Sequence, residues 1–480
     1  MPVVENAWRT VRFEPAEIVE PESVEDVQRI VREAAAAGRK VKAVGGRHSM
    51  NHVFRTAGVL VDLRRMNRIL SVDRETGEVE VEGGLQLGDA IAALDAEGLH
   101  LPSLGSWHTQ SLAGAVATST HGSSMTHGSF SDIVTEMEAV LGDGSVRRFG
   151  DGDALRAMRC SLGRLGIVTK LKLRLTPAFM LHCEIESGPA DAAFAEATER
   201  ARADEWVNML WLPDLDEACT RVLTRIDAPE RNRAARALER KFTRRSTLSH
   251  RLEDVAFFLL GHAYQIAPSW LSDRYAGLVK RAFFDDQGVV DKSYRVFLYD
   301  QYREPTENHR LRVIMNVEYA FDLDRLEPML RAMRDLLAEQ RRRGRFLNYP
   351  RVHVRFAPKR DETLIGLNAD RDTAYVGIYV VGSIRPKRQI PLAEAIERLF
   401  LEHEGRPHWG KFSYLGPDGH HRFYPGWERF EAIRRDLDPE GVFEEGADAL
   451  EDLDTFEDPP LGAMLRSIFD RDEYQEIRLL

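Results

Sequence analysis

A glycine pair followed by a histidine is the first feature of this sequence that could do chemistry. Successive backbone N–H groups in a glycine loop can turn inward and form a nest that receives a diphosphate. The usual dinucleotide fingerprint, G-x-G-x-x-G between a strand and a helix, is absent, so a plain glycine turn with an exposed histidine stays an alternative. The loop consists of Val44, Gly45, Gly46, Arg47, His48, Ser49 and Met50.

Two more glycine-rich blocks follow and favour a cofactor site over a plain turn. One spans residues 105–122 and the other residues 161–168. Small side chains let the backbone approach a flat ring closely, and hydroxyl groups can bond to ring carbonyls or to a diphosphate. The candidate residues of these blocks are Gly105, Ser106, Ser111, Gly114, Thr118, Ser119, Thr120, His121, Gly122, Gly166, Ile167 and Val168.

Basic and imidazole side chains in the C-terminal half complete the candidate set. His353 and Arg355 lie two residues apart in an apolar run, so a strand would turn both to one face. Lys411 closes a fourth block, His-Trp-Gly-Lys. His403 and His408 lack the H-E-x-x-H spacing of a zinc-binding helix, and the proline between them would interrupt that helix, so no metal site is predicted.

In content and order, the four blocks resemble the PCMH-type FAD-binding proteins of the vanillyl-alcohol oxidase superfamily, and within it the aldonolactone and alditol oxidases. The resemblance covers most of the chain. It implies that FAD is bound by the glycine loop 44–50 and by the candidate residues of the two later blocks. Ile167 and Val168 would lie on the adenine side, and Gly105, Ser106 and Lys411 beside the flavin.

The resemblance places His48 where covalently flavinylated members of the family carry a histidine. A neutral imidazole at the flavin edge can attack the methyl carbon at ring position 8, and the resulting bond would hold FAD and raise its reduction potential. The alternative is a histidine that only forms hydrogen bonds within the loop. We expect FAD attached covalently through His48.

The resemblance also implies four catalytic residues. A fixed cation at Lys411 would stabilise the negative charge that flavin reduction leaves at the N1–C2 oxygen locus. Arg355 and Ser106 would bind the substrate hydroxyl. Lactone- and polyol-oxidising members carry Glu-x-Arg on this strand, whereas His353 stands here at the carboxylate position. An altered substrate preference and a base near neutral pH are both open for this histidine.

The electron acceptor is predicted from one position. In the resembling proteins, a glycine at Gly105 accompanies the use of oxygen, and an alanine blocks the approach of oxygen in a related dehydrogenase. Gly105 therefore favours an oxidase, although a glycine required for a turn explains it equally well.

Periodicity and turn signals predict an α+β fold that can hold these residues. In the first part of the chain, Ser23 and Asp26 have the spacing of a capping box, an apolar stripe follows, and Gly38 ends the helix. Alternating apolar patterns farther along predict a large, mostly antiparallel sheet. The predicted strands are 17–20, 41–44, 59–63, 78–82, 167–175, 207–212, 313–319, 352–356 and 375–381, and the predicted helices are 24–37, 87–97, 326–343, one from 392, and 427–437.

The expected domains follow from these elements. They are an FAD-binding domain at 1–177, a substrate-binding cap domain at 178–400 with a helical, Arg-rich insert at 227–284, a C-terminal segment at 401–445 that returns to the FAD site, and an acidic tail at 446–480. The apolar run 255–260 in the insert is too short to span a membrane. A buried helix, a subunit contact and a membrane-surface element are the alternatives for it.

Length and composition exclude several classes of protein. A chain of 480 residues is too long for one compact core. Its net charge of −11 argues against a nucleic-acid partner, because phosphate binding needs a surplus of Lys and Arg. Three irregularly spaced cysteines favour a reducing compartment, and neither a signal peptide nor a transmembrane run is recognised, so a cytoplasmic protein is expected. The oligomeric state is open, with a homo-oligomer among the options.

The predicted function is an FAD-dependent oxidase that transfers a hydride from a carbinol carbon of a sugar lactone, polyol or related alcohol to flavin N5, with oxygen as the final acceptor. One alternative keeps the cofactor and passes the electrons to a quinone or cytochrome. Another, of a different class, is a flavin-binding protein without catalysis whose Arg-rich insert docks a partner. The sequence does not identify which alcohol is the substrate.

Overall fold

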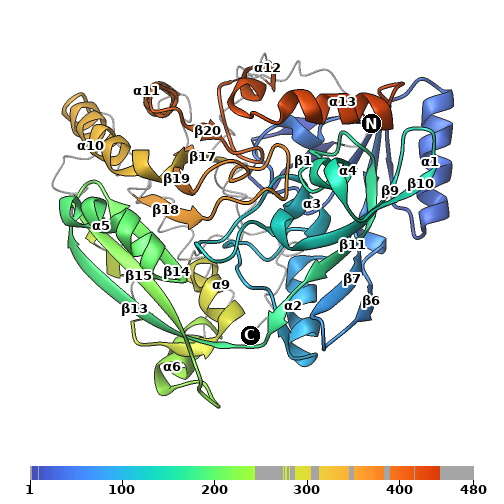
Figure 1. Ribbon diagram of the computed structural model, residues 1–480. Helices are drawn as coiled ribbons and strands as arrows, with labels where there is room; N and C mark the ends of the chain where they lie inside the picture. Colours follow the sequence, from blue (N-terminus) through green and yellow to red (C-terminus); the bar gives the residue numbers. More distant parts are fainter. Residues whose placement is uncertain are drawn as a thin grey trace, which may run out of the picture.

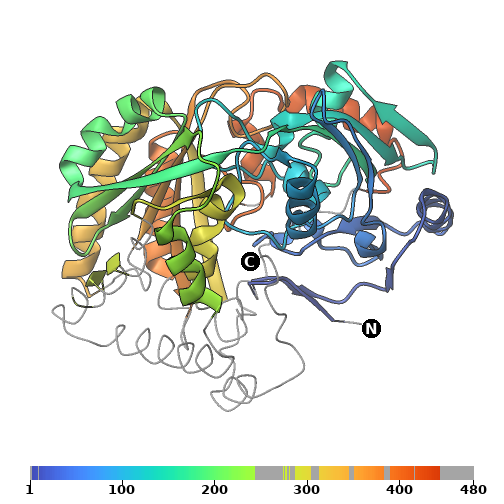
Figure 2. The same ribbon diagram turned by 90° about the horizontal axis from the view of Figure 1, so that it is seen from below.

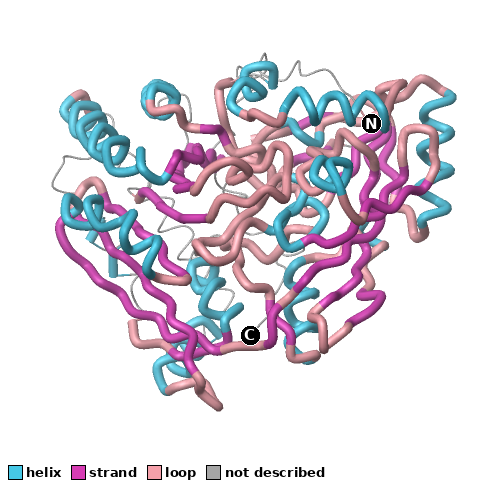
Figure 3. The backbone as a smooth tube through the Cα atoms, viewed as in Figure 1, coloured by secondary structure: helices cyan, strands magenta, loops and turns pink. Residues whose placement is uncertain are grey.

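The computed structural model describes residues 3–8, 10–243, 274, 276–277, 280–281, 287–303, 313–344, 351–382, 390–415 and 417–443. The apolar run 255–260, most of the Arg-rich insert and the acidic tail lie outside the described residues. Two groups of strands flank a central region of loops (Figures 1 and 3). The fold is α+β with a large antiparallel sheet, which confirms the predicted fold class.

The glycine loop is positioned by a small parallel sheet of order β3-β5-β4 with helix α1 packed on it. Ser23 caps α1 as predicted, since its hydroxyl accepts a hydrogen bond from the backbone N–H of Asp26 at 3.1 Å. Apolar residues of α1 face the sheet, and β4 then delivers the chain to the loop at its end. The bounds are β3 Glu17–Val19, α1 Val24–Ala36, β4 Val41–Val44 and β5 Val59–Asp62.

A five-stranded antiparallel sheet, of order β10-β9-β11-β7-β6, forms the rest of the N-terminal part. Strand β11 starts at Ile167, at the end of the third glycine block. The elements of this part are β1 Val4–Glu5, β2 Arg12–Phe13, β6 Ile69–Val72, β7 Glu78–Glu82, α2 Leu87–Ala96, β8 Leu99–His100, α3 Leu112–Ala117, β9 Val134–Val140, β10 Val146–Phe149, α4 Gly152–Met158, β11 Ile167–Arg174 and β12 Thr176–Pro177.

The second part of the chain builds an eight-stranded antiparallel sheet, of order β16-β13-β15-β14-β18-β19-β17-β20. Helices α5, α10 and α11 pack on its outer face, away from the N-terminal elements (Figures 1 and 2). The bounds are β13 Met180–Pro189, α5 Ala190–Ala203, β14 Trp206–Leu212, β15 Glu217–Ile226, α6 Arg233–Thr243, β16 Val290–Lys292, α9 Ser293–Arg303, β17 Val313–Asp322, α10 Leu326–Arg342, β18 Val352–Ala357, β19 Thr373–Gly382, α11 Ile390–Glu402 and β20 Arg406–Pro407.

Alternation along the three neighbouring strands β18, β19 and β17 assigns each face of this sheet. One residue set joins the apolar core beneath the outer helices, and the intervening residues project from the opposite face, toward the loops. The core set is Val317, Tyr319, Phe321, Val352, Val354, Phe356, Ala374, Val376 and Ile378. The opposite set is Asn316, Glu318, Ala320, His353, Arg355, Tyr375, Gly377 and Tyr379.

The last described segment returns to the N-terminal part. After β20 closes the edge of the large sheet, α12 (Pro417–His420) and α13 (Trp427–Leu437) follow, and α13 packs against α4. None of the helices in the described ranges is both long enough and apolar enough to cross a bilayer.

Candidate functional site

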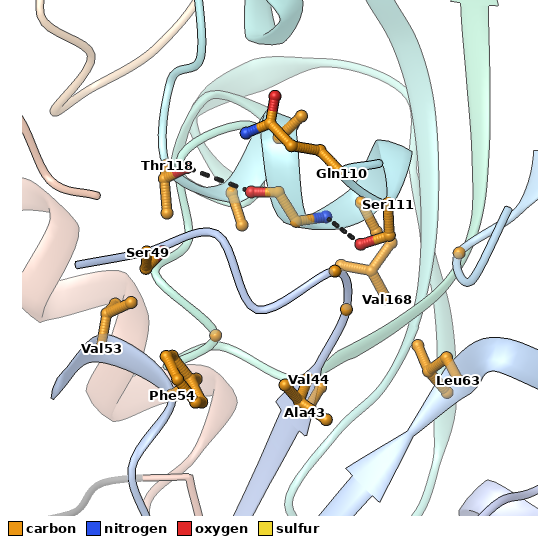
Figure 4. A pocket seen from close by; sticks show the side chains of 18 of the residues that line it. Ala43, Val44, Ser49, Val53, Phe54, Leu63, Gln110, Ser111, Thr118 and Val168 are labelled. Carbon is orange, nitrogen blue, oxygen red and sulfur yellow. Dashed lines mark hydrogen bonds between the residues drawn. The ribbon is translucent and has the colours of Figure 1, made fainter. Parts of the chain in front are cut away.

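A cavity lies where the glycine loop meets α3 and the third glycine block (Figure 4). Its walls consist mainly of glycine, alanine, serine and branched apolar residues. Thr118 donates a hydrogen bond to the carbonyl of Gly114 at 3.1 Å, and the Gly114 N–H donates to the hydroxyl of Ser111 at 3.3 Å. The lining residues are 43–49, Val53, Phe54, Leu63, Gly83, Gln110, Ser111, 113–115, Ala117, Thr118, 161–163, Gly166 and Val168.

Glycine is required where the loop touches the second block. A Cβ atom on Gly45 would overlap the hydroxyl of Ser111, and one on Gly46 would overlap the carbonyl of Thr109. Arg47 has a positive φ of 57° and its guanidinium pairs with the buried carboxylate of Asp62 at 3.1 Å. The loop therefore lies directly on the second block, with the backbone exposed to the cavity.

His48 forms hydrogen bonds through both its backbone carbonyl and its ring. Its carbonyl accepts a hydrogen bond of 2.7 Å from the indole N–H of Trp8, and its Nε2 lies 2.7 Å from the hydroxyl of Thr109. Its other ring nitrogen, Nδ1, is buried and has no hydrogen-bond partner among the described residues. Burial, followed by the charge of Lys411, lowers the pKa of His48 to about 4, so the ring is neutral near pH 7.

A second group of candidates lies on the inner face of the large sheet. Arg355 on β18 donates a hydrogen bond of 2.7 Å to the hydroxyl of Ser106. The ring of His121 stacks on Tyr375 with 3.4 Å between centroids. His353 projects from the same face as Arg355 because the two alternate along the strand.

Gly105 lies beside this second group. A Cβ atom there would come within 3.3 Å of the His121 carbonyl and 3.5 Å of the Thr120 methyl group. Those distances leave room for a methyl group after small shifts.

Hydrogen bonds to backbone carbonyls tie the block 408–411 to the glycine loop and to Asn51 directly after it. The side-chain amide of Asn51 donates to the carbonyls of Trp409, at 2.6 Å, and Lys411, at 3.2 Å. The N–H of Met50 donates to the carbonyl of Gly410 at 2.9 Å. These contacts place Lys411 between the cavity-forming loop and the large sheet.

A buried carboxylate that the sequence analysis did not single out lies next to this lysine. Glu318 is 5% exposed, and its Oε2 lies 3.4 Å from Nζ of Lys411 while its Oε1 lies 3.2 Å from Nε2 of His121. Despite its burial, the nearby charge of Lys411 and the hydrogen bond from His121 hold the pKa of Glu318 well below its usual range. One signal could have found it: Glu318 is the only charged residue of the predicted strand 313–319.

The structure thus brings the predicted residues into two adjoining groups. Those that line the cavity are Val44, Gly45, Gly46, Arg47, His48, Ser49, Ser111, Gly114, Thr118, Gly166 and Val168. Those outside its lining are Met50, Gly105, Ser106, Ser119, Thr120, His121, Gly122, Ile167, His353, Arg355 and Lys411. Ile167 packs in the apolar core with α1. Within the described part of the chain, no group of three or more His, Cys, Asp or Glu could hold a metal ion.

Comparisons with known proteins find related families and relatives along most of the chain. Residues 15–150 match the family model of an FAD binding domain, and residues 171–450 match that of D-arabinono-1,4-lactone oxidase. The L-gulono-1,4-lactone dehydrogenase of Mycobacterium tuberculosis is 29% identical over 429 residues, 89% of this chain and 94% of that protein. The L-gulonolactone oxidase of Bos taurus is 26% identical over 457 residues, 92% of this chain and 96% of that protein.

A solved structure shares the fold. Cholesterol oxidase from B. sterolicum superposes with a TM-score of 0.74 at 17% identity, over 92% of this chain and 95% of the oxidase. At that identity the likeness concerns the fold alone.

Proposed function

This chain belongs to the D-arabinono-1,4-lactone oxidase family, whose model matches residues 171–450 of 480, and on that premise we propose that it is an oxidase of sugar lactones and related alcohols that uses oxygen. Membership confirms the resemblance found in the sequence and makes the chain an FAD-dependent oxidoreductase of sugar lactones. The proposal adds the electron acceptor, a covalent bond through His48 and the roles of individual residues.

The residues around the cavity fit FAD. Walls of glycine and alanine suit a flat ring, and the exposed backbone of Gly45 and Gly46 offers N–H groups to a diphosphate. The unpartnered Nδ1 of His48 is a buried polar atom that a bound group would satisfy. When bound, FAD supplies a hydride acceptor at N5 for a carbinol carbon and passes the electrons to oxygen, which yields hydrogen peroxide.

His48 is suited to a covalent bond by its protonation state. A nucleophilic imidazole must be neutral with a free lone pair, and the lowered pKa keeps this ring neutral at physiological pH. If Nε2 carries the proton, it donates a hydrogen bond to the Thr109 hydroxyl. The lone pair is then on Nδ1, the nitrogen with no other partner in the described structure. We therefore assign the bond to Nδ1.

The inner face of the sheet supplies the groups that act on the substrate. Arg355 and Ser106 already share a hydrogen bond, so together they present a fixed donor and a hydroxyl that can bind and orient a lactone hydroxyl. His353, on the same face, can accept a proton from that hydroxyl or bind a second one. The ammonium group of Lys411 would stabilise the negative charge that develops on the flavin when it is reduced.

The proposal rests mainly on one observation: the residues that line the cavity are connected to the residues on the inner face of the large sheet. Hydrogen bonds from Asn51 and Met50 connect the cavity loop to the block that carries Lys411, so cofactor and substrate groups meet at one place. The use of oxygen is supported by Gly105. The dehydrogenase among the relatives favours a second candidate, a lactone dehydrogenase with another acceptor.

The test begins with the visible spectrum of purified protein before and after acid precipitation. Yellow colour that stays with the pellet, and is lost from it in His48→Ala, supports the covalent bond, and colour released from the wild-type protein refutes it. A panel of aldonolactones and polyols is then assayed in air and with a dye acceptor. Peroxide formation with a lactone supports the oxidase, and turnover only with the dye favours the dehydrogenase.

A further inference from the structure

Glu318 is a buried, charged residue in the centre of the site. It has no role in the proposed binding of the cofactor or of the substrate. It lies on β17 directly opposite Gly377 on β19, and Gly377 lies opposite His353 on β18. The three residues form one row across three neighbouring strands, with their side-chain positions on the same face.

The side chain of Glu318 packs over the glycine in the middle of this row. A Cβ atom on Gly377 would be 3.4 Å from both Cγ and Cδ of Glu318. The side chain of Glu318 therefore leans over the glycine, toward the position of His353. These distances are ordinary van der Waals contacts, so an alanine at 377 would leave the carboxylate in place.

The two carboxylate oxygens have different partners. Oε1 faces His121, and Oε2 faces both Nζ of Lys411, at 3.4 Å, and the side-chain amide of Asn316, at 3.5 Å. Because the carboxylate is buried, its attraction for the ammonium group is screened far less than at the surface. Removing one partner of such a pair leaves the other charge uncompensated.

The backbone on either side of Lys411 is also bonded to this strand. The N–H of His408 donates to the carbonyl of Glu318 at 3.0 Å, and the N–H of Phe412 donates to the carbonyl of Asn316 at 3.0 Å. The chain around Lys411 is thus anchored to β17 at two points, and the ammonium group at the end of its side chain lies 3.4 Å from the Glu318 carboxylate.

We propose that Glu318 is a positioning residue that fixes the ammonium group of Lys411 beside the cofactor. This rests on the proposed function, because it assumes that Lys411 acts at the flavin. A lysine side chain alone can adopt many rotamers. The Glu318 carboxylate holds the ammonium group of Lys411 in one position, so that the cation stays beside the cofactor.

The proposal separates two effects of removing the carboxylate. If Glu318 only contributed negative charge, its removal would make the site more positive and strengthen the binding of an anion at the cofactor. If Glu318 positions Lys411, its removal weakens that binding even though the site has lost a negative charge. Sulfite distinguishes the two cases, since it adds reversibly to oxidised flavin and leaves negative charge on the ring.

The experiment titrates FAD-loaded wild-type protein, Glu318→Gln and Glu318→Asp with sulfite and follows the loss of the yellow absorbance. We expect the dissociation constant of Glu318→Gln to rise about tenfold or more and that of Glu318→Asp to lie between the two. With a lactone substrate, kcat should fall more than KM changes. The matched control is Glu138→Gln, another buried carboxylate paired with a lysine, Lys170, at 2.9 Å on the five-stranded sheet.

Unchanged or tighter sulfite binding in Glu318→Gln overturns the proposal. If that variant does not fold or load FAD, Glu318→Asp replaces it, because it keeps the negative charge but shortens the side chain by one methylene group. Sulfite binding equal to wild type in Glu318→Asp then overturns the proposal. The sulfite titration uses no lactone, so a wild-type protein that oxidises no lactone contradicts the proposed function and leaves the test of Glu318 intact.

Discussion

Arg355 donates a hydrogen bond of 2.7 Å to the hydroxyl of Ser106, a residue 249 positions earlier in the chain. The bond joins the inner face of the large sheet to the second glycine block. It fixes a guanidinium and a hydroxyl at the point where the two parts of the protein meet.

Replacing Arg355 should therefore affect the reaction more than replacing Ser106. Arg355→Ala removes a charged donor, and we expect kcat/KM for the best lactone to fall about 100-fold, whereas Ser106→Ala should cost about tenfold because it removes a neutral group. Steady-state kinetics measures both values, and thermal melting checks the fold. A larger effect in Ser106→Ala would contradict the assigned roles.

Gly45→Ala should abolish FAD binding. The new methyl group would overlap the hydroxyl of Ser111, so the loop would have to leave the second block and the cavity would lose a wall. Flavin content after purification, from the visible spectrum, measures the effect. Gly188→Ala is the matched control, because a Cβ atom there meets nothing within 4 Å, and it should retain full flavin content.

Gly105→Ala should slow the reaction with oxygen and spare turnover with a dye. A methyl group at this position would lie 3.3 Å from the His121 carbonyl, so the variant should fold with small shifts. We expect at least about a tenfold fall in the oxygen-dependent rate, since a single methyl group can close the path to the flavin. Equal rates of flavin reoxidation by oxygen in variant and wild type would leave Gly105 with a turn-forming role only.

Acid should destabilise the protein through its buried histidines. Burial lowers the pKa of His408 to about 3 and that of His420 to about 4, from 6.5. In the window between about pH 6.5 and 4, the unfolded chain binds protons at these rings that the folded chain does not, so the free energy of unfolding falls as the pH is lowered. The loss is roughly 3 kcal/mol for each histidine.

Urea unfolding at several pH values measures this loss. His420→Phe removes one of the two groups and should reduce the pH dependence in that window. His420 forms an edge contact with Trp409 at 5.6 Å between ring centroids, a contact that phenylalanine can keep. An unchanged pH dependence in this variant would show that His420 is not a source of the acid sensitivity.

Short sequence patterns predicted those helices, strands and loops that depend on residues close together in the chain. The capping box at Ser23 and the apolar stripe that follows gave the helix α1, and alternation in residues 352–356 gave a strand with His353 and Arg355 on one face. The glycine blocks were found because close backbone contacts need glycine, as at Gly45. Strands such as β13 and β15 were missed, because their pairing rather than their pattern defines them.

Long-range pairing also explains why Glu318 was missed. Its neighbours in the site, His121 and Lys411, come from distant segments, and its position opposite Gly377 depends on the register of β17 and β19. A single sequence carries the residue types at these positions. Which strand lies beside which is decided by the packing of the whole sheet.

The hydrogen bonds from Asn51 to the carbonyls of Trp409 and Lys411 connect residues about 360 positions apart. During synthesis, the glycine loop leaves the ribosome long before its partner does. The growing chain consequently cannot finish the site until residue 411 has emerged, and a product that ends before residue 409 lacks both contacts.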